Sequence, residues 1–142
     1  MLFGKRERRI SRILIVEDEP LVAFDNEYML KDAGYTIVAT VDNVADARTV
    51  IEAEPLDLVL TDIALRGEGN GIDVARAAGT REIPVLVVTG NCSEEARGFA
   101  LGCLSKPYGE RVLLGALKAV DDHLQGKTVK KLPGQLTLYV QA

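Results

Sequence analysis

The chain has 142 residues, of which 47% are hydrophobic and 27% charged, and its formal net charge is −4. This length fits one domain with a real hydrophobic core, and the composition is ordinary for a soluble globular protein. The acidic balance argues against direct DNA binding through a basic surface. No apolar run is long enough for a signal peptide or a membrane span, so we expect a cytoplasmic protein with no membrane association.

The charge is unevenly spread, because the chain starts with a basic stretch. Residues 1–12 carry five basic side chains against Glu7, a local charge of +4, which leaves −8 for residues 13–142. We interpret residues 1–11 as a basic N-terminal extension with a solvated, frayed end. An arm that contacts nucleic acid or a membrane surface is the alternative. Cys92 and Cys103 are too few for a disulfide framework, and we expect both to be reduced thiols.

Short apolar runs alternate with helical patterns through residues 12–124. Runs typical of strands buried on both faces occupy residues 13–16, 58–60 and 85–88. Residues 35–41 read as another strand, and residues 100–104 as a weaker fifth. A first helix is predicted from Pro20, with a stop at Gly34. Its predicted apolar face consists of Leu21, Val22, Phe24, Tyr28, Met29 and Ala33.

Three further helices are expected. Asn43 with Asp46 resembles a capping box in front of a second helix, and residues 71–78 are predicted as a short third. The stretch from Thr89 to Lys106 leaves little room for a full helix, so we expect a shortened or irregular one there, with Ser93 as its cap. A long last helix is marked by Leu113, Leu117, Val120 and Leu124. The repeated βα order predicts an α/β fold with a doubly wound, five-stranded parallel sheet, (βα)5.

Polar residues follow the predicted strands directly, at the sheet edge where such folds carry their sites. Glu17 and Asp18 end the first strand and Asp62 ends the third. Thr89 ends the fourth, and Lys106 follows the fifth. Each residue alone has a structural explanation, as a helix cap, a loop residue or a solvated lysine. Their coincidence at one edge favours a site instead.

The chemistry of this set is that of phosphoryl transfer. Three carboxylates close together repel one another, and a divalent cation relieves that cost. Oxygen ligands of this kind favour a hard ion, so we expect Mg²⁺ as the cofactor. Lys106 adds a positive charge and Thr89 a hydroxyl donor, while an aspartate carboxylate is a reasonable phosphoryl acceptor.

Four segments in order resemble the receiver domain of two-component response regulators. They are Ile13 to Pro20, Leu58 to Asp62, Val87 to Gly90 and Leu104 to Pro107, and the resemblance covers residues 12–124. It implies a flavodoxin-like fold and phosphorylation of Asp62 by a sensor histidine kinase or a histidine phosphotransfer protein.

The resemblance also implies a role for each neighbour of Asp62. Asp18 matches a direct Mg²⁺ ligand, Glu17 an acidic neighbour that acts through water, and the backbone carbonyl of Ala64 completes the protein's metal ligands. Thr89 matches the switch hydroxyl that contacts the phosphoryl group. Lys106 matches the lysine that pairs with that group, and its bond to Pro107 is typically cis in this family.

The sequence departs from the common receiver pattern at several positions. The loop after Asp62 lacks the usual Met-Pro, and its alternating glycines at 67, 69 and 71 are interpreted as a flexible loop. Cys103 stands where many receivers carry a switch aromatic, and Tyr108 is a candidate substitute. The stretch Pro84 to Gly90 resembles alphaproteobacterial single-domain regulators with a Phe-Ala-Thr-Gly-type strand, often tied to stress signalling, although Val87-Val88 replaces Phe-Ala here.

Residues 125–142 are a tail in which positions 135–140 alternate like a half-buried strand. Such a strand needs an edge to pair with, either its own sheet or a neighbouring chain, so the protein is a monomer or a tail-mediated dimer; a disordered tail is the alternative. His123 is the only histidine and is expected at the surface, which leaves a Ser-His-Asp or zinc site without support.

The function that these patterns favour is a stand-alone response regulator that signals by protein–protein interaction. It would catalyse only its own phosphorylation and dephosphorylation. A phosphate sink or shuttle in a phosphorelay remains open. A metal-dependent phosphatase is disfavoured, because Asp62-Ile63-Ala64 lacks the Asp-x-Asp arrangement of aspartate-nucleophile phosphatases. We expect the output surface at residues 91–110 and the last helix, with the loop at 67–71 as the alternative.

Overall fold

The computed structural model describes residues 8–92, 94–129 and 131–139, and these form one six-stranded sheet in the order β2-β1-β3-β4-β5-β6. The strands are β1 (Arg12–Val16), β2 (Thr36–Val41), β3 (Leu58–Asp62), β4 (Val85–Thr89), β5 (Gly102–Ser105) and β6 (Leu136–Leu138). The first five are parallel, as predicted, and β6 runs antiparallel to β5. The expectation of a purely five-stranded (βα)5 sheet was wrong, because the tail supplies a sixth strand.

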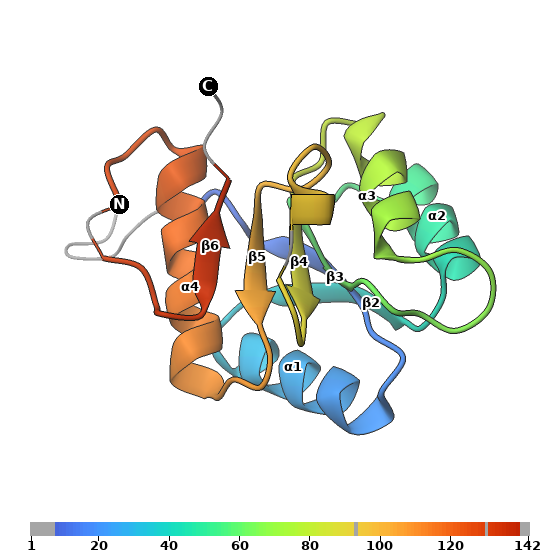
Figure 1. Cartoon of the computed structure of the whole chain (residues 1–142), viewed down its shortest axis with the longest axis horizontal. Helices are drawn as coiled ribbons and strands as arrows, with labels where there is room; N and C mark the ends of the chain where they lie inside the picture. The colour runs from blue at the N-terminus through green and yellow to red at the C-terminus, as the bar shows by residue number, and fades with distance from the viewer. Residues whose placement is uncertain (1–7, 93, 130, 140–142) are drawn as a thin grey trace.

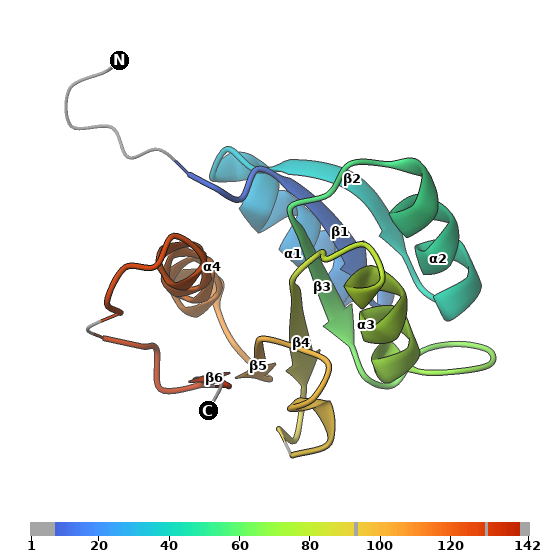
Figure 2. The same cartoon turned by 90° about the horizontal axis from the view of Figure 1, so that it is seen from above.

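Helices cover both faces of the sheet (Figures 1 and 2). They are α1 (Pro20–Asp32), α2 (Val44–Ala53), α3 (Gly71–Gly79) and α4 (Glu110–Leu124). α1 and α4 pack on one face, where Leu30, Leu113 and Leu117 meet the buried strand residues Ile15 and Leu60. α2 and α3 pack on the other face. Because β1 and β3 are covered on both sides, each contains a continuous apolar run, at residues 13–16 and 58–60.

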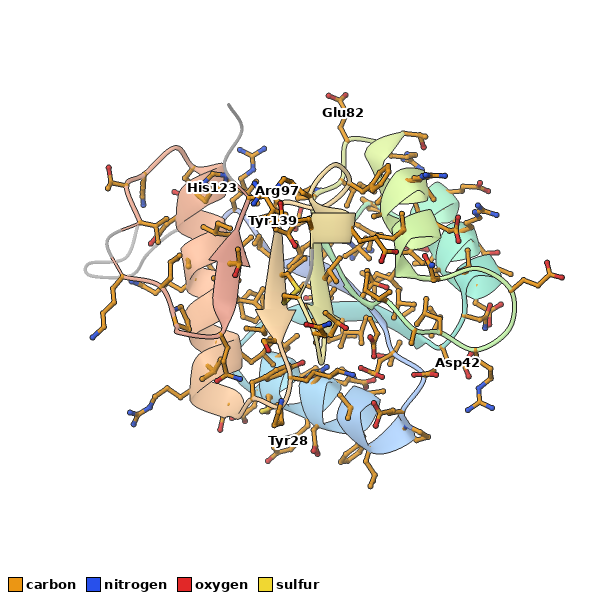
Figure 3. All side chains as sticks on the ribbon, viewed as in Figure 1. Tyr28, Asp42, Glu82, Arg97, His123 and Tyr139 are labelled. Carbon is orange, nitrogen blue, oxygen red and sulfur yellow. A yellow bond between two sulfur atoms is a disulfide. The ribbon has the colours of Figure 1, made fainter. Side chains whose placement is uncertain are left out.

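Within the described residues of the connection from β4 to β5, the one helical element is the 3-10 turn η1 (Glu94–Ala96), so the expected shortening of a helix here is pronounced. Without a helix, other groups cover this part of the sheet: Ala96, Cys103 and Tyr139 all belong to the buried cluster on the α2 and α3 face. Figure 3 shows Arg97 and Tyr139 side by side near this turn, and the guanidinium of Arg97 lies 5.0 Å from the ring centroid. The predicted cap Ser93 lies outside the described residues.

Cys92 and Cys103 form a disulfide, so the prediction of two reduced thiols was wrong. The prediction rested on the number of cysteines and on the absence of an export signal. It missed that the short connection returns over β4 and brings the two Cα atoms to 6.0 Å, a separation typical of disulfides.

The predicted apolar face of α1 was wrong in part: Met29 and Ala33 pack against the core, but three of its large residues do not. The residues of α1 that are buried are Ala23, Asn26 and Leu30. Leu21 is 80% exposed, Phe24 67% and Tyr28 65%. The apolar residues of α1 itself are spread around nearly the whole circumference of the helix, so the sequence pattern could not show which side meets the sheet. As a result, α1 presents a row of large apolar side chains to solvent.

Both ends of the described chain pack against the domain. Arg8 places its guanidinium 4.2 Å from the centroid of the Tyr35 ring, and the carboxylate of Asp121 accepts the backbone N–H groups of Arg9 and Ile10. Residues 8–11 are therefore held in place, which corrects the interpretation of this part as frayed; residues 1–7 lie outside the description. No helix in the described ranges is long and apolar enough to cross a membrane.

The C-terminal tail adds a strand to its own sheet. β6 pairs with β5 in the register Gly102 to Leu138 and Leu104 to Leu136. The backbone N–H of Tyr139 donates to the carbonyl of Leu101 at 2.9 Å. The predicted alternation is present in part: Leu136 is buried and Leu138 partly buried on the α1 and α4 face, and Thr137 is exposed. Tyr139, which the alternation placed on the exposed side, is instead buried on the α2 and α3 face. Position 140, which the predicted strand also included, is not described.

Candidate functional site

Three carboxylates meet at the carboxyl edge of the sheet, as predicted. β1 leads into Glu17 and Asp18, and the neighbouring strand β3 ends in Asp62, with Val16 in register with Thr61. One oxygen of each carboxylate lies within 4.8 Å of one oxygen of the other two. Glu17 and Asp62 are buried and Asp18 is half-buried. The adjacency of the two strands brings together residues that are separated by more than forty positions in the sequence.

Lys106 reaches this cluster from the loop after β5. Its Nζ lies 2.6 Å from Oδ2 of Asp62 and 2.9 Å from Oε1 of Glu17, and 3.4 Å from Oε1 of the more exposed Glu19. The side chain of Lys106 is only 15% exposed. Its bond to Pro107 is cis, as the family resemblance implied.

Two opposing effects act on the pKa values in the cluster: burial disfavours the charged forms, and contact between opposite charges favours them. Burial alone would lower the pKa of Lys106, but the hydrogen bonds to Asp62 and Glu17 outweigh it and raise that pKa, so the ammonium stays charged. Burial raises the pKa of Glu17, although its hydrogen bond with Lys106 opposes that shift. The site therefore holds two buried carboxylates against one ammonium, and such an arrangement is sensitive to loss of the cation.

Backbone groups hold the carboxylates in position. Oδ1 of Asp62 accepts the N–H of Ile63 at 2.7 Å, and Oε2 of Glu17 accepts the N–H of Glu19 at 3.0 Å. Oδ2 of Asp62 and Oε1 of Glu17 remain directed at Lys106. Each carboxylate therefore has one oxygen fixed by the backbone and the other turned into the shared space.

Thr89 ends β4 at the same edge and is half-buried. Its hydroxyl oxygen accepts the N–H of Asn91 at 3.4 Å, and its carbonyl accepts the N–H of Lys106 at 2.8 Å. Thr89 also lines a small pocket of about 60 Å³ together with Cys103 and Tyr139. The predicted switch residue is thus linked through the backbone to the lysine, and through this pocket to the disulfide and the tail.

Ala64 lies in the exposed loop after β3, two residues past Asp62, and the role of its carbonyl as a metal ligand stays a prediction. The loop has firm contacts: the N–H of Arg66 donates to the carbonyl of Asp42, and their side chains form an ion pair at 3.4 Å. Gly67 and Gly69 have φ angles of +79° and +85°, which explains their residue type. These contacts therefore hold the loop to Asp42, the residue that follows β2.

Gly71 has a role that sequence reasoning missed. It starts α3, and its N–H donates to the carbonyl of Ile63 at 2.7 Å. A Cβ at Gly71 would lie 2.1 Å from the carbonyl oxygen of Asp62. Glycine is needed here because the start of α3 passes directly over the backbone of Asp62. The capping box of Asn70 and Asp73, a recognisable signal one residue earlier, fixes this approach.

Tyr108 lies on the α1 side of the sheet, where its hydroxyl donates to Oδ1 of the buried Asn26 at 3.0 Å. Burial raises the pKa of Tyr108 to about 12, so the hydroxyl remains protonated and can donate. Tyr139, from the tail, is instead the aromatic residue that shares a pocket with Thr89. The sequence offered no signal for this, because the partner lies fifty residues further along the chain.

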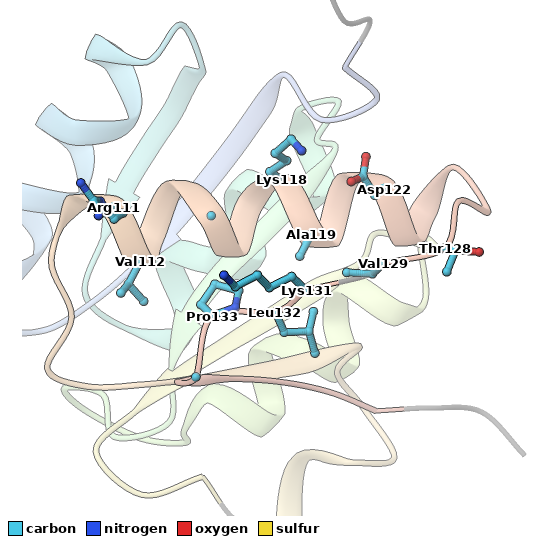
Figure 4. A pocket seen from close by; sticks show the side chains of 12 residues that line it. Arg111, Val112, Lys118, Ala119, Asp122, Thr128, Val129, Lys131, Leu132 and Pro133 are labelled. Carbon is cyan, nitrogen blue, oxygen red and sulfur yellow. The ribbon is translucent and has the colours of Figure 1, made fainter.

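The donor set fits a small hard cation. The three carboxylates supply oxygen ligands only, which is the chemistry of Mg²⁺ sites. A pocket of about 360 Å³ opens beside Glu17 and Asp18 and reaches Asp42 and Arg66, which leaves space for water ligands. A larger pocket of about 540 Å³ lies between α4 and residues 128–129 and 131–134 (Figure 4) and contains none of the predicted site residues. His123 is exposed on α4, as expected.

Comparison with known proteins identifies the class to which this fold and site belong. A model of the response regulator receiver domain family matches residues 13–118, and the chain belongs to that family. A CheY-like receiver domain protein from Methanospirillum hungatei JF-1 is 27% identical over 82% of this chain and 98% of its own, with a TM-score of 0.73.

Two further solved structures are similar. The receiver domain of the sensor histidine kinase PA1611 from Pseudomonas aeruginosa PAO1 is 26% identical over 76% of this chain and 94% of its own, with a TM-score of 0.67; it holds a magnesium ion in its active site cleft. A response regulator receiver protein from Sinorhizobium medicae WSM419 is also 26% identical, over 77% of this chain and 92% of its own, with a TM-score of 0.67.

Proposed function

We propose that this protein is a stand-alone response regulator in which Asp62 accepts a phosphoryl group from a histidine kinase or a histidine phosphotransfer protein. The observation that carries the proposal is the contact of Lys106 with Asp62 at 2.6 Å, inside a cluster whose carboxylate oxygens lie within 4.8 Å of one another. A buried carboxylate, a cation beside it and further acidic ligands form the set that phosphoryl transfer requires.

Each residue has a chemical part in this proposal. Asp62 is the nucleophile and would attack through Oδ2, the oxygen that contacts Lys106. Glu17, Asp18 and Asp62, with the carbonyl of Ala64, would hold Mg²⁺, which when bound neutralises charge on the incoming phosphoryl group. Lys106 would pair with that group, and the Thr89 hydroxyl would turn to donate to it.

The exposed face of α1 supports a docking role for the phosphodonor protein. Leu21, Phe24 and Tyr28 lie at helical spacing and form an apolar patch on a helix that starts next to the acidic cluster. A pocket of about 360 Å³, lined in part by Val22 and Pro107, adjoins this helix and Lys106. A protein seated on α1 could therefore present a phosphohistidine to Asp62.

Replacement of Phe24 by serine should separate docking from chemistry. We expect transfer from a phosphorylated histidine phosphotransfer protein to slow by about tenfold, because the loss of one buried aromatic anchor costs more than 1 kcal/mol. Labelling by a small phosphodonor should stay at the wild-type rate. Phe99→Ser is the matched control, since Phe99 is also exposed but lies near η1. Equal slowing by both variants would contradict the assignment of α1.

Stoichiometry distinguishes a switch from an enzyme. With a small phosphodonor and Mg²⁺, we expect one phosphoryl group per chain and no sustained hydrolysis of a small phosphate ester. Many turnovers of the ester per chain would favour a metal-dependent phosphatase instead. If a labelled chain returns its phosphoryl group to a phosphotransfer protein faster than it hydrolyses it, the sink or shuttle role is favoured over a signalling output.

We further propose a place among alphaproteobacterial regulators of the Phe-Ala-Thr-Gly type, with a role in stress signalling in the cytoplasm. The stretch Pro84 to Gly90 and the absence of a full helix between β4 and β5 support this. The tail pairs with its own β5, which supports a monomer over a tail-mediated dimer. The output surface is proposed at residues 91–110, because Thr89 and Lys106 bracket this segment.

A further inference from the structure

The disulfide occupies a particular place relative to the site. Cys92 lies three residues after Thr89, and Cys103 lies three residues before Lys106. Two links therefore join the two ends of the chain between Thr89 and Lys106. One is the hydrogen bond from the N–H of Lys106 to the carbonyl of Thr89 at 2.8 Å, and the other is the disulfide. Any movement of Thr89 toward a group on Asp62 must be accommodated by this closed segment.

Besides the disulfide, the contacts of residues 91–99 with the rest of the domain include two cation–π contacts, of Arg97 with the Tyr139 ring and of Arg76 with the Phe99 ring. Among residues 91–99 that the structure describes, Ala96 is buried, and Phe99 is 39% exposed. The hydrogen bonds of η1 are local, such as those from the N–H groups of Phe99 and Ala100 to the carbonyl of Ala96. The ion pair of Arg97 with Glu94 is exposed. With so few buried contacts, the stability of this segment depends strongly on the disulfide.

The disulfide also contributes to the buried cluster on the α2 and α3 face of the sheet. Cys103 is 1% exposed and belongs to the same buried cluster as Ala96 and Tyr139. Thr89, Cys103 and Tyr139 line one pocket of about 60 Å³. Opening of the disulfide would therefore change the packing next to the Thr89 hydroxyl and next to the tail residue that covers it.

The two cysteine residues differ in exposure. Cys92 is half-buried at the start of the connection, whereas Cys103 is enclosed in β5. An external thiolate would attack the sulfur of the more exposed cysteine, Sγ of Cys92, and release Sγ of Cys103 as the leaving group.

We propose that Cys92 and Cys103 are a reversible redox site that sets the mobility of the Thr89–Lys106 segment, and that its substrate class is a dithiol reductant. This rests on the proposed function, because the segment matters through Thr89 and Lys106. The reductant's first thiolate forms a mixed disulfide with Cys92, and Cys103 leaves as a thiolate that takes a proton. The reductant's second thiol then displaces Cys92. Two electrons pass to the protein, and the reductant becomes a disulfide.

The experiment compares oxidised protein, protein reduced by a dithiol under native conditions, and Cys92→Ser. Alkylation followed by intact mass counts the free thiols, and circular dichroism checks the fold. We expect two alkylated cysteines in the folded reduced protein. We also expect amide exchange at residues 90–101 to be about tenfold faster than in the oxidised form, with β1 and β3 unchanged. Cys92→Ser should match the reduced protein in either buffer.

Phosphorylation provides the second readout. Labelling of reduced protein by a small phosphodonor with Mg²⁺ should be about threefold faster than labelling of oxidised protein, because Thr89 is freer to turn. Cys92→Ser should be fast and insensitive to the reductant. The proposal is overturned if the disulfide opens only in denaturant, or if exchange and labelling are the same in both states. No labelling in either state would overturn the proposed function alone, while alkylation and exchange would still decide the redox site.

Discussion

Lys106→Ala should lower the free energy of unfolding by about 3 kcal/mol in the absence of Mg²⁺, because it removes an ammonium that contacts both buried carboxylates, Glu17 and Asp62. Glu17 and Asp62 are 3% and 8% exposed, so water cannot compensate for the loss. Addition of Mg²⁺ should restore most of the lost stability, since the cation replaces the missing charge. Urea unfolding with and without the metal measures both effects.

Lys31→Ala is the control for this prediction. Lys31 also pairs with a carboxylate at 2.6 Å, but its side chain is 55% exposed on α1. Surface pairs of this kind contribute about 0.5 kcal/mol or less, so this variant should melt close to the wild type, with or without Mg²⁺. A Lys106→Ala protein that melts above the wild type without metal would show that the carboxylates do not need the lysine, and the electrostatic account would fail.

Gly71→Ala should damage stability and phosphorylation together. The added Cβ would lie 2.1 Å from the carbonyl oxygen of Asp62 and 2.9 Å from Cα of Ile63, and both are backbone atoms. Backbone cannot turn aside as a flexible side chain can, so we expect a loss of about 3 kcal/mol, at the upper end of overpacking costs. Any relief must displace Asp62 itself, and labelling by a small phosphodonor should slow by about tenfold or more.

Gly79→Ala tests whether this effect depends on position or on glycine in general. Gly79 ends the same helix, and a Cβ there would meet no heavy atom within 4 Å apart from its chain neighbours and the backbone of its own helix. This variant should be neutral or more stable by about 0.5 kcal/mol, and its labelling should match the wild type. If Gly71→Ala also behaves in this way, the start of α3 does not position Asp62.

The strands and the acidic cluster could be predicted because they follow from local patterns and one general rule. Continuous apolar runs mark strands that are buried on both faces, and parallel strands gather the residues at their carboxyl ends at one edge. These two considerations were sufficient to predict that Glu17, Asp18 and Asp62 lie close together. The cis bond before Pro107 came from the family resemblance, whereas the position of Lys106 after the fifth strand already indicated a cation at this edge; the structure shows both.

The missed features all depend on contacts between distant parts of the chain. The buried side of α1 could not be predicted, because the apolar residues of that helix are spread around nearly its whole circumference, and the sheet covers the side with Leu30. The disulfide depends on how a short connection returns over β4. The need for glycine at position 71 arises from the backbone of Asp62, nine residues earlier. Tyr139 joins the buried cluster on the α2 and α3 face from a tail that is distant in the sequence.

The most direct test of the account is to locate the phosphoryl group itself. Protein incubated with a small phosphodonor and Mg²⁺ should gain the mass of one phosphoryl group, and peptide mapping should place it on Asp62. Asp62→Asn should gain none, and chelation of Mg²⁺ should prevent the gain in the wild type. Labelling of the Asp62→Asn protein to the wild-type level, or a phosphoryl group on any other residue of the wild type, would contradict the assignment of Asp62 as the acceptor.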